Sequence, residues 1–320
     1  MSRFGAHSAY IHPSRNFHFK LAFINKMNQF EIYAPLQNFV WSRNNFEFAP
    51  GLWIKDYCTQ KPDLRDLEAE LSRSERSDVN SGASHWLTFH WNEGTEPCPA
   101  EIVNLVLISL WLVKPTASHV AFRFKLGQGD GADKKGVSRL YDRFAWLPDA
   151  AHESFKDGDL HSAKSFYPPL FDICCAKGGR LNNALMLTLT GCFSIYWQVA
   201  LICHTAAADA LLTYSTERGI TRRLATSYAC LVETQKTCRD AAYKDFWELY
   251  SIRSDIMHGR THNVASSERL PFLAQTVLRK LWGTVLSSPQ IISILEDSDA
   301  QRKKYMSQLT SGYTPPNPNP

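Results

Sequence analysis

The stretch ELYSIRSDIMHGR, from Glu248 to Arg260, places an arginine on an apolar helical stripe and then ends on a histidine and a glycine. Ala242 and Phe246 precede it at positions that share one helix face with Arg253. A charge on a core-facing stripe needs a partner or a cleft, because burying an unpaired charge is costly. The stretch therefore predicts a helix that is buried along most of its length and carries a paired or functional arginine near its end.

The residues after the arginine predict how this helix stops. Gly259 is the usual residue for the left-handed turn that ends a helix, so His258 is expected in the last turn. There the helix dipole favours the protonated imidazole, whereas the positive charge of Arg253 opposes it. A histidine under these opposing influences, near a guanidinium, is suited to proton transfer at a phosphate.

A second apolar stripe lies upstream and contains a single ionisable residue, Asp209. Its members recur at helical spacing and are Ile195, Val199, Ile202, Ala206, Asp209 and Thr213. We expect this stripe to face the core and Asp209 to pair with Arg253. An internal pair that only holds two helices in register remains the alternative to a functional site.

The chain around these stripes has helical periodicity from about residue 157 onward. Helices are expected at 159–176, 180–190, 194–214, 220–235, 239–258, 268–287 and 289–296, with glycine-containing breaks between several of them. We expect an all-α bundle over residues 155–300. The ending SGYTPPNPNP is rich in proline, so residues 308–320 are expected to be a disordered tail.

The first half has a different character, and the expected fold class is therefore α+β. Short aromatic or β-branched runs, FHFKLAFI (17–24), FEIYA (30–34), HWLTFHW (85–91) and HVAFRFKL (119–126), are typical of strands. One apolar helix is expected over 100–113, ended by Pro115. The glycine-rich run 127–136 lacks the Gly-Lys-Ser/Thr ending of a phosphate loop and is interpreted as a solvated loop. Residues 1–150 are expected to form a mixed α/β domain.

The composition of the chain indicates in which cellular compartment the protein is expected and whether it needs a cofactor. The net charge of +4 permits a nucleic-acid partner without indicating one, and the N-terminus lacks the apolar core of a secretory signal. Scattered cysteines suit reduced thiols in a cytoplasmic protein, and Cys203 beside His204 has no complementary pair of ligands, so no metal or other cofactor is expected. The charge-free run 184–203 has the length of a membrane span, but its polar residues favour two buried helices broken at Gly191, and we expect no membrane association.

At LYSIRSDIMHG the sequence resembles HEPN-domain proteins, and specifically their Apea-like branch. The hallmark is an arginine, four to six residues, and a histidine near the end of a bundle helix, which Arg253 and His258 match. The likeness continues upstream through residues 199–233 and covers roughly 155–300. One position departs from the branch: Asp209 stands in AAADALL where a glutamate in an LE-x-LL setting is usual.

The resemblance implies a metal-independent ribonuclease, or a non-catalytic RNA-binding and dimerising module, of the kind found in toxin–antitoxin and phage-defence systems. For cleavage, the RNA 2′-hydroxyl is the nucleophile, His258 is the general base or acid, and Arg253 binds the phosphate and offsets its growing charge. Ser254 and Asp255 are candidates to orient the histidine or the substrate.

Three further residues complete the predicted site. Tyr250 is expected either to stack on a base or to pack as an ordinary aromatic. Arg260 and His262 lie just beyond the helix and are candidate contacts for RNA phosphates, or members of a solvated loop.

One histidine per chain makes acid and base catalysis difficult, so a homodimer through the helical domain is expected to bring two copies of the motif to one cleft. An antitoxin or regulatory partner is also possible in such systems. The alternative function is a binding or dimerisation module without catalysis. In both cases the first half would be a sensor or regulatory domain.

Overall fold

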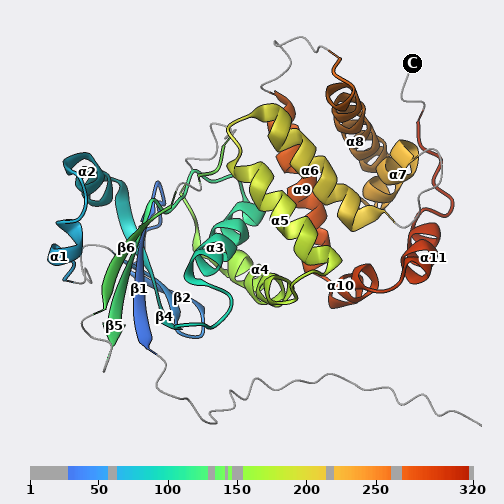
Figure 1. Cartoon of the computed structure of the whole chain (residues 1–320). Helices are drawn as coiled ribbons and strands as arrows, with labels where there is room; N and C mark the ends of the chain where they lie inside the picture. The colour runs from blue at the N-terminus through green and yellow to red at the C-terminus, as the bar shows by residue number, and fades with distance from the viewer. Residues whose placement is uncertain are drawn as a thin grey trace, which may run out of the picture.

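The structure is a computed structural model that describes residues 28–56, 63–128, 134–140, 143–145, 154–213, 220–260 and 269–316. An N-terminal antiparallel sheet is followed by a body of packed helices (Figure 1). The expected order of a mixed α/β part and then helices is therefore confirmed at this level.

Six strands form the sheet among the described residues, in the order β2-β3-β4-β1-β5-β6. They are β1 (Gln29–Gln37), β2 (Asn45–Ala49), β3 (Leu52–Asp56), β4 (Ala83–Asn92), β5 (Phe122–Gln128) and β6 (Lys135–Arg139). The predicted strands 30–34 and 85–91 lie within β1 and β4, which pair with Phe30 opposite Trp91. The run 119–126 overlaps β5, whereas the run 17–24 lies outside the described residues. β2, β3 and β6 were not predicted, because five residues give little alternation to detect.

Eleven helices lie in the described part of the chain. They are α1 (Arg65–Glu68), α2 (Arg73–Gly82), α3 (Pro99–Val113), α4 (Asp157–Cys175), α5 (Arg180–Phe193), α6 (Trp197–Leu212), α7 (Ile220–Val232), α8 (Lys236–Met257), α9 (Arg269–Leu286), α10 (Pro289–Glu296) and α11 (Asp299–Leu309). Each of the eight predicted helices overlaps one of these, α3 to α10. The short helices α1 and α2 were missed, and so was α11.

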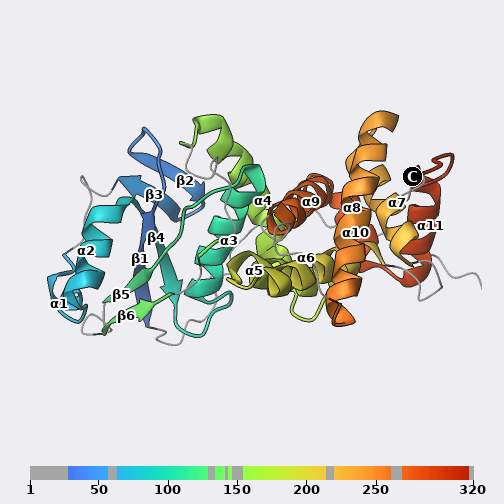
Figure 2. The ribbon, with the colours of Figure 1, turned by 90° about the horizontal axis from the view of Figure 1, so that it is seen from above.

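The helix α3 connects the two parts of the fold. It lies between the sheet and the remaining helices (Figures 1 and 2), and nearly every residue from Val103 to Leu112 is buried. Trp111 on α3 donates its indole N–H to Gln275 on α9 at 3.3 Å. One continuous cluster of buried apolar residues runs from β1 through α3 into the bundle. The proposed units 1–150 and 155–300 therefore share a core.

The run 184–203 forms two helices, but the break is not at Gly191. α5 continues to Phe193 and α6 begins at Trp197. Gly191 is needed for packing instead: a Cβ there would lie 2.6 Å from the imidazole of His204 on α6. Glycine therefore lets α5 approach α6 closely. Among the described residues, the helices are all too short or too polar to cross a bilayer.

The C-terminal end of the packed chain lies beyond the expected boundary. α11, with its polar sequence DAQRKKYMSQL, extends the helices past residue 300. Tyr313 lies in the region expected to be a disordered tail, yet its hydroxyl donates to Asp240 at 2.9 Å and its ring packs against the core. The expectation of a disordered tail is therefore wrong for residues 308–316, and residues 317–320 lie outside the described part.

Candidate functional site

The helix α8 passes from the core to the surface, as its sequence predicted. Phe246 and Leu249 are buried, whereas the side chain of Arg253, one turn further along the same stripe, is 26% exposed. The stripe thus begins in apolar packing against α6 and α9 and ends at solvent. This places the guanidinium at the rim of the bundle.

Arg253 belongs to a three-residue cluster that joins α6 to α8. Its Nη2 lies 3.6 Å from Oδ2 of Asp209, which confirms the predicted pair. The Tyr250 hydroxyl lies 2.8 Å from each Asp209 carboxylate oxygen and donates to this carboxylate. The guanidinium carbon lies 4.9 Å from the centre of the Tyr250 ring, within cation–π range. The aspartate therefore reaches both partners, although its side chain is shorter than that of a glutamate.

Burial governs the electrostatics of this cluster. Desolvation raises the pKa of Asp209, and the hydrogen bond from Tyr250 and the charge of Arg253 partly oppose that rise. Desolvation and the neighbouring Asp209 carboxylate raise the pKa of Tyr250, so its hydroxyl stays protonated and remains a donor. The rise for Tyr250 therefore favours its hydrogen bond to Asp209, whereas the rise for Asp209 reflects the cost of burying its charge.

Tyr250 does not present its ring to a base. It is 5% exposed, and its ring stacks on Phe246 and lies beneath the guanidinium of Arg253. Its position one turn before Arg253 places it on the buried side of α8. Tyr250 is thus a support for Arg253 and Asp209, and the stacking role considered from sequence is not available to it.

An open hollow of about 590 Å³ adjoins the cluster on the α6 side. It is lined by Asp209, by the last turn of α6 and by Arg180 at the start of α5. Nη1 of Arg180 donates to the carbonyl oxygens of Ala210 and Thr213 at 2.8 and 2.7 Å, which satisfies the end of α6. Arg180 was missed from sequence, where KGGR was interpreted only as a break between helices.

The end of α8 has the geometry that Gly259 predicted. Gly259 has a φ of 68°, and the N–H groups of Gly259 and Arg260 donate to the carbonyls of Ile256 and Asp255. These two bonds define a Schellman motif, in which His258 is the residue that caps the helix. The imidazole of His258 is exposed at this end.

The remaining predicted residues are distributed around this end. Asp255 forms an ion pair with Arg260, with 2.9 Å between Oδ1 and Nη1. Ser254 is half-buried on α8. His262 lies outside the described residues.

Arg253 and His258 project on different sides of α8. Five positions along an α-helix rotate a side chain by about 140°, and the helix stays regular until His258. Within one chain the structure therefore brings together Arg253, Asp209 and Tyr250, and separately Asp255 and Arg260. It does not bring the imidazole of His258 into the Arg253 cluster.

In the described residues there is no group of three or more His, Cys, Asp or Glu side chains that could hold a metal ion. His204, considered from sequence beside Cys203, is buried against Gly191. Its two ring nitrogens have no hydrogen-bond partner in the described part of the chain. Comparison with protein-family models, with curated proteins and with solved structures finds no match to this chain.

Proposed function

We propose that the chain is a metal-independent endoribonuclease of HEPN type, in which Arg253 binds the scissile phosphate and His258 transfers the proton. The observation that supports this most is the surface end of α8. Arg253 is held there, partly exposed, by Asp209 and Tyr250, and an exposed histidine caps the same helix.

The binding role of Arg253 rests on its unused hydrogen-bonding capacity. Its ion pair with Asp209 spans 3.6 Å, longer than an ordinary hydrogen bond. Arg302, an arginine buried in α11, instead donates to the carbonyls of Leu295 and Asp297 and to the carboxylate of Asp299. A guanidinium that is oriented but not saturated is suited to bidentate binding of a phosphate. Asp209 and Tyr250 are then positioning residues.

The proton-transfer role of His258 rests on its exposure and its place. In the proposed reaction the imidazole removes the proton from the 2′-hydroxyl and the 2′-oxygen attacks phosphorus. The bond from phosphorus to the 5′-oxygen breaks, and the 5′-oxygen takes a proton from the protonated His258 of the partner subunit. This yields a 2′,3′-cyclic phosphate and a 5′-hydroxyl. Arg253 offsets the charge that grows on the phosphate oxygens, and Arg260 lies at the same helix end as a contact for a neighbouring phosphate.

A second copy of the chain would bring two arginines and two histidines to one cleft, which one chain does not do because its Arg253 and His258 project on different sides of α8. The stripe that was expected to face the core supports this, because the fold leaves much of it uncovered. Ile195 is 72% exposed and Val199 is 42% exposed, and the stripe leads along α6 to Asp209. A strict monomer in sedimentation equilibrium at micromolar concentration would contradict the dimer.

Cellular context follows from the same proposal. A ribonuclease of this type would act in the cytoplasm in a toxin–antitoxin or phage-defence role, restrained by an antitoxin or another regulatory protein. The sheet and its helices would be the sensor or regulatory part. Arrest of growth on expression of the native chain, relieved by His258→Ala, is the expected cellular result.

The test is cleavage of a labelled RNA by the purified chain. Products should carry 2′,3′-cyclic phosphate ends, and the rate should be unchanged by excess EDTA, because the nucleophile is part of the substrate. An identical DNA strand, which lacks the 2′-hydroxyl, should remain intact. Cleavage that stops with EDTA would rule out this mechanism.

One observation favours a second candidate, an RNA-binding or dimerisation module without catalysis. Arg253 is already paired with Asp209, as in a purely structural contact between helices. In that case the native chain should shift RNA in fluorescence anisotropy without cutting it, and His258→Ala should bind RNA as the native chain does.

A further inference from the structure

The helices α3 and α4 pack against each other in antiparallel directions, and two ion pairs mark their register. Nζ of Lys114, just after α3, lies 3.2 Å from Oδ2 of Asp159 in the first turn of α4. At the other end, Glu96 before α3 pairs with Lys177 after α4. The same number of residues separates the two ion pairs along both helices. Each step forward along α3 therefore corresponds to one step backward along α4.

This register brings three thiols to one end of the helix pair. Cys98 is the N-cap of α3 and follows Glu96 by two residues. Cys175 is the last residue of α4 and precedes Lys177 by two residues. Cys98 on α3 therefore lies opposite Cys175 and its neighbour on α4, Cys174.

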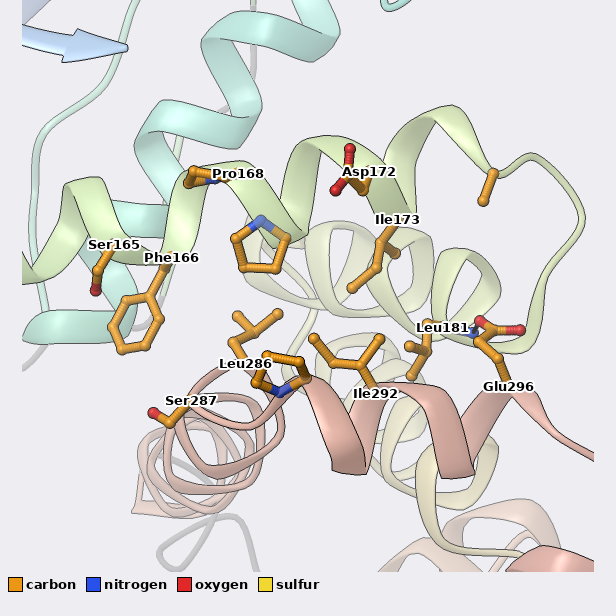
Figure 3. Close-up of a pocket in the computed structure, with 13 residues that line it drawn as sticks. Ser165, Phe166, Pro168, Asp172, Ile173, Leu181, Leu286, Ser287, Ile292 and Glu296 are labelled. Carbon is orange, nitrogen blue, oxygen red and sulfur yellow. Dashed lines mark hydrogen bonds between the residues drawn. The ribbon is translucent and has the colours of Figure 1, made fainter. Parts of the chain in front are cut away.

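The two cysteines of α4 are not turned toward the groove on the far side of this helix. That groove, of about 1010 Å³, lies between α4 and α10 (Figure 3). Ile173 and Ala176 line it, whereas Cys174 and Cys175 are not among the described residues that do. Figure 3 shows Ile173 directed into the groove and Asp172, one turn before Cys175, directed away from it.

The three thiols differ in how readily an oxidant reaches them. Cys98 and Cys175 are exposed, whereas Cys174 is 4% exposed. Burial raises the pKa of Cys174 to about 11, with smaller contributions from the charges of Glu101, Cys175 and Cys98. Burial and then the charge of Asp172 raise the pKa of Cys175. A thiol that stays protonated is a poor nucleophile, so we expect Cys98 to react first with an oxidant.

We propose that Cys98 and the pair Cys174–Cys175 form a peroxide-responsive site in which a disulfide links α3 to α4. The sulfur of Cys98 attacks one oxygen of the peroxide, the O–O bond breaks, and a sulfenic acid and water form. The thiol of Cys174 or Cys175 then attacks this sulfur, the S–O bond breaks, and the hydroxyl leaves with the thiol proton as water. Two thiols are thereby oxidised to a disulfide, and one hydrogen peroxide is reduced to two waters.

This disulfide would act on the helix that joins the two parts of the fold. α3 lies between the sheet and the remaining helices (Figures 1 and 2), so a bond from its first residues to α4 would restrain the sheet relative to the bundle. Disulfides that form in a reducing compartment are usually transient and redox-sensing. The site is separate from the Arg253 cluster and does not depend on RNA cleavage.

Peptide mapping of the full-length protein tests the proposal. The reduced protein is treated with hydrogen peroxide, the remaining thiols are alkylated with N-ethylmaleimide, and the unreduced digest is analysed by mass spectrometry. The peptide that contains Cys98 should be linked to the peptide that contains Cys174 and Cys175, and dithiothreitol should separate them. Cys238→Ser, which removes an exposed thiol on α8, is the control and should give the same link at the native rate.

Variants of the three cysteines separate this site from other oxidations. Cys98→Ser should abolish the link and leave the fold intact, because the side chain is exposed. At least one of Cys174→Ala and Cys175→Ala should keep the link, whereas the double variant should lose it. A disulfide within the pair Cys174–Cys175, a Cys98 that is oxidised without being linked or that stays reduced, or a link between two chains in non-reducing electrophoresis would overturn the proposal.

Discussion

Two places along the contact between α6 and α8 differ in how they accommodate a polar side chain: one buries it without a partner, and the other pairs it. At the first, His204 is 1% exposed beside Phe246 and Leu249, and its ring nitrogens have no partner in the described structure. At the second, five residues further along α6, Asp209 is hydrogen-bonded, paired and partly open to solvent. The same two helices form both places.

Close packing holds the first place together, whereas charges and hydrogen bonds hold the second. His204 is held by close packing against Gly191, and burial lowers its pKa to about 3, so it is neutral. The second place accommodates an aspartate and an arginine. The hydroxyl of Tyr250, the opposite charges of the pair and its partial exposure to solvent together offset the cost of desolvating the two charged groups. Contacts of the first kind stabilise the fold, whereas contacts of the second kind can be exchanged for those of a ligand.

The largest expected effect is on catalysis at the charged place. His258→Ala should slow RNA cleavage by about 10²–10⁴-fold, the usual contribution of a general acid or base. The fold should be unaffected, because the side chain is exposed. His90→Ala, at another exposed histidine, is the control and should cleave at the native rate. Native-rate cleavage by the His258→Ala protein would exclude this residue from the reaction.

Arg253→Ala should separate activity from stability. Loss of the phosphate contact should reduce cleavage by about 10²–10³-fold. Asp209 would lose its cation but keep Tyr250, so the free energy of unfolding should fall by only about 1–2 kcal/mol. Urea unfolding and cleavage assays measure the two effects. A variant that loses stability but still cleaves RNA would make the cluster structural, like Arg302.

At the packed place, Gly191→Ala should destabilise the protein by about 2–3 kcal/mol, because the new Cβ would overlap the His204 ring. Gly283→Ala on α9 is the matched control. Nothing lies within 4 Å of its Cβ position, so alanine should be neutral or should stabilise the helix by up to about 1 kcal/mol. Equal urea midpoints for the two variants would show that α5 and α6 are less tightly packed than described.

The pH dependence of stability should reveal the neutral histidine. The pKa of His204 falls from 6.5 to about 3 on folding. Between these two pH values the unfolded chain binds a proton at His204, whereas the folded chain does not. The contribution of His204 to the free energy of unfolding is therefore fully present above pH 6.5. It decreases as the pH falls below 6.5, by about 2 kcal/mol at about pH 5.

His85 is also buried with a lowered pKa and adds a change of the same sign, so the comparison must be between variants. His204→Leu should remove about 2 kcal/mol of the difference in unfolding free energy between pH 8 and about pH 5. An unchanged pH dependence in this variant would mean that His204 takes up its proton while folded.

Much of the candidate site could be anticipated from residue patterns. The interruption of an apolar stripe by Arg253 indicated a side chain that is paired or lines a cleft, and the only ionisable member of the α6 stripe, Asp209, is its partner. The role of Tyr250 could not be resolved, because an aromatic at that spacing can point to a base or to the core. Arg180 gave no signal, since its partners are backbone carbonyls 30 and 33 residues away.

The sequence by itself determined where α4 to α10 lie and how α8 ends, because periodicity, proline and glycine act within a few residues. It did not determine which face of α6 is buried. That helix is apolar around most of its circumference, so either face satisfies the pattern. Only packing against α5, α8 and α9 decided that Ala200, Leu201 and His204 turn inward, leaving Ile195 and Val199 at the surface.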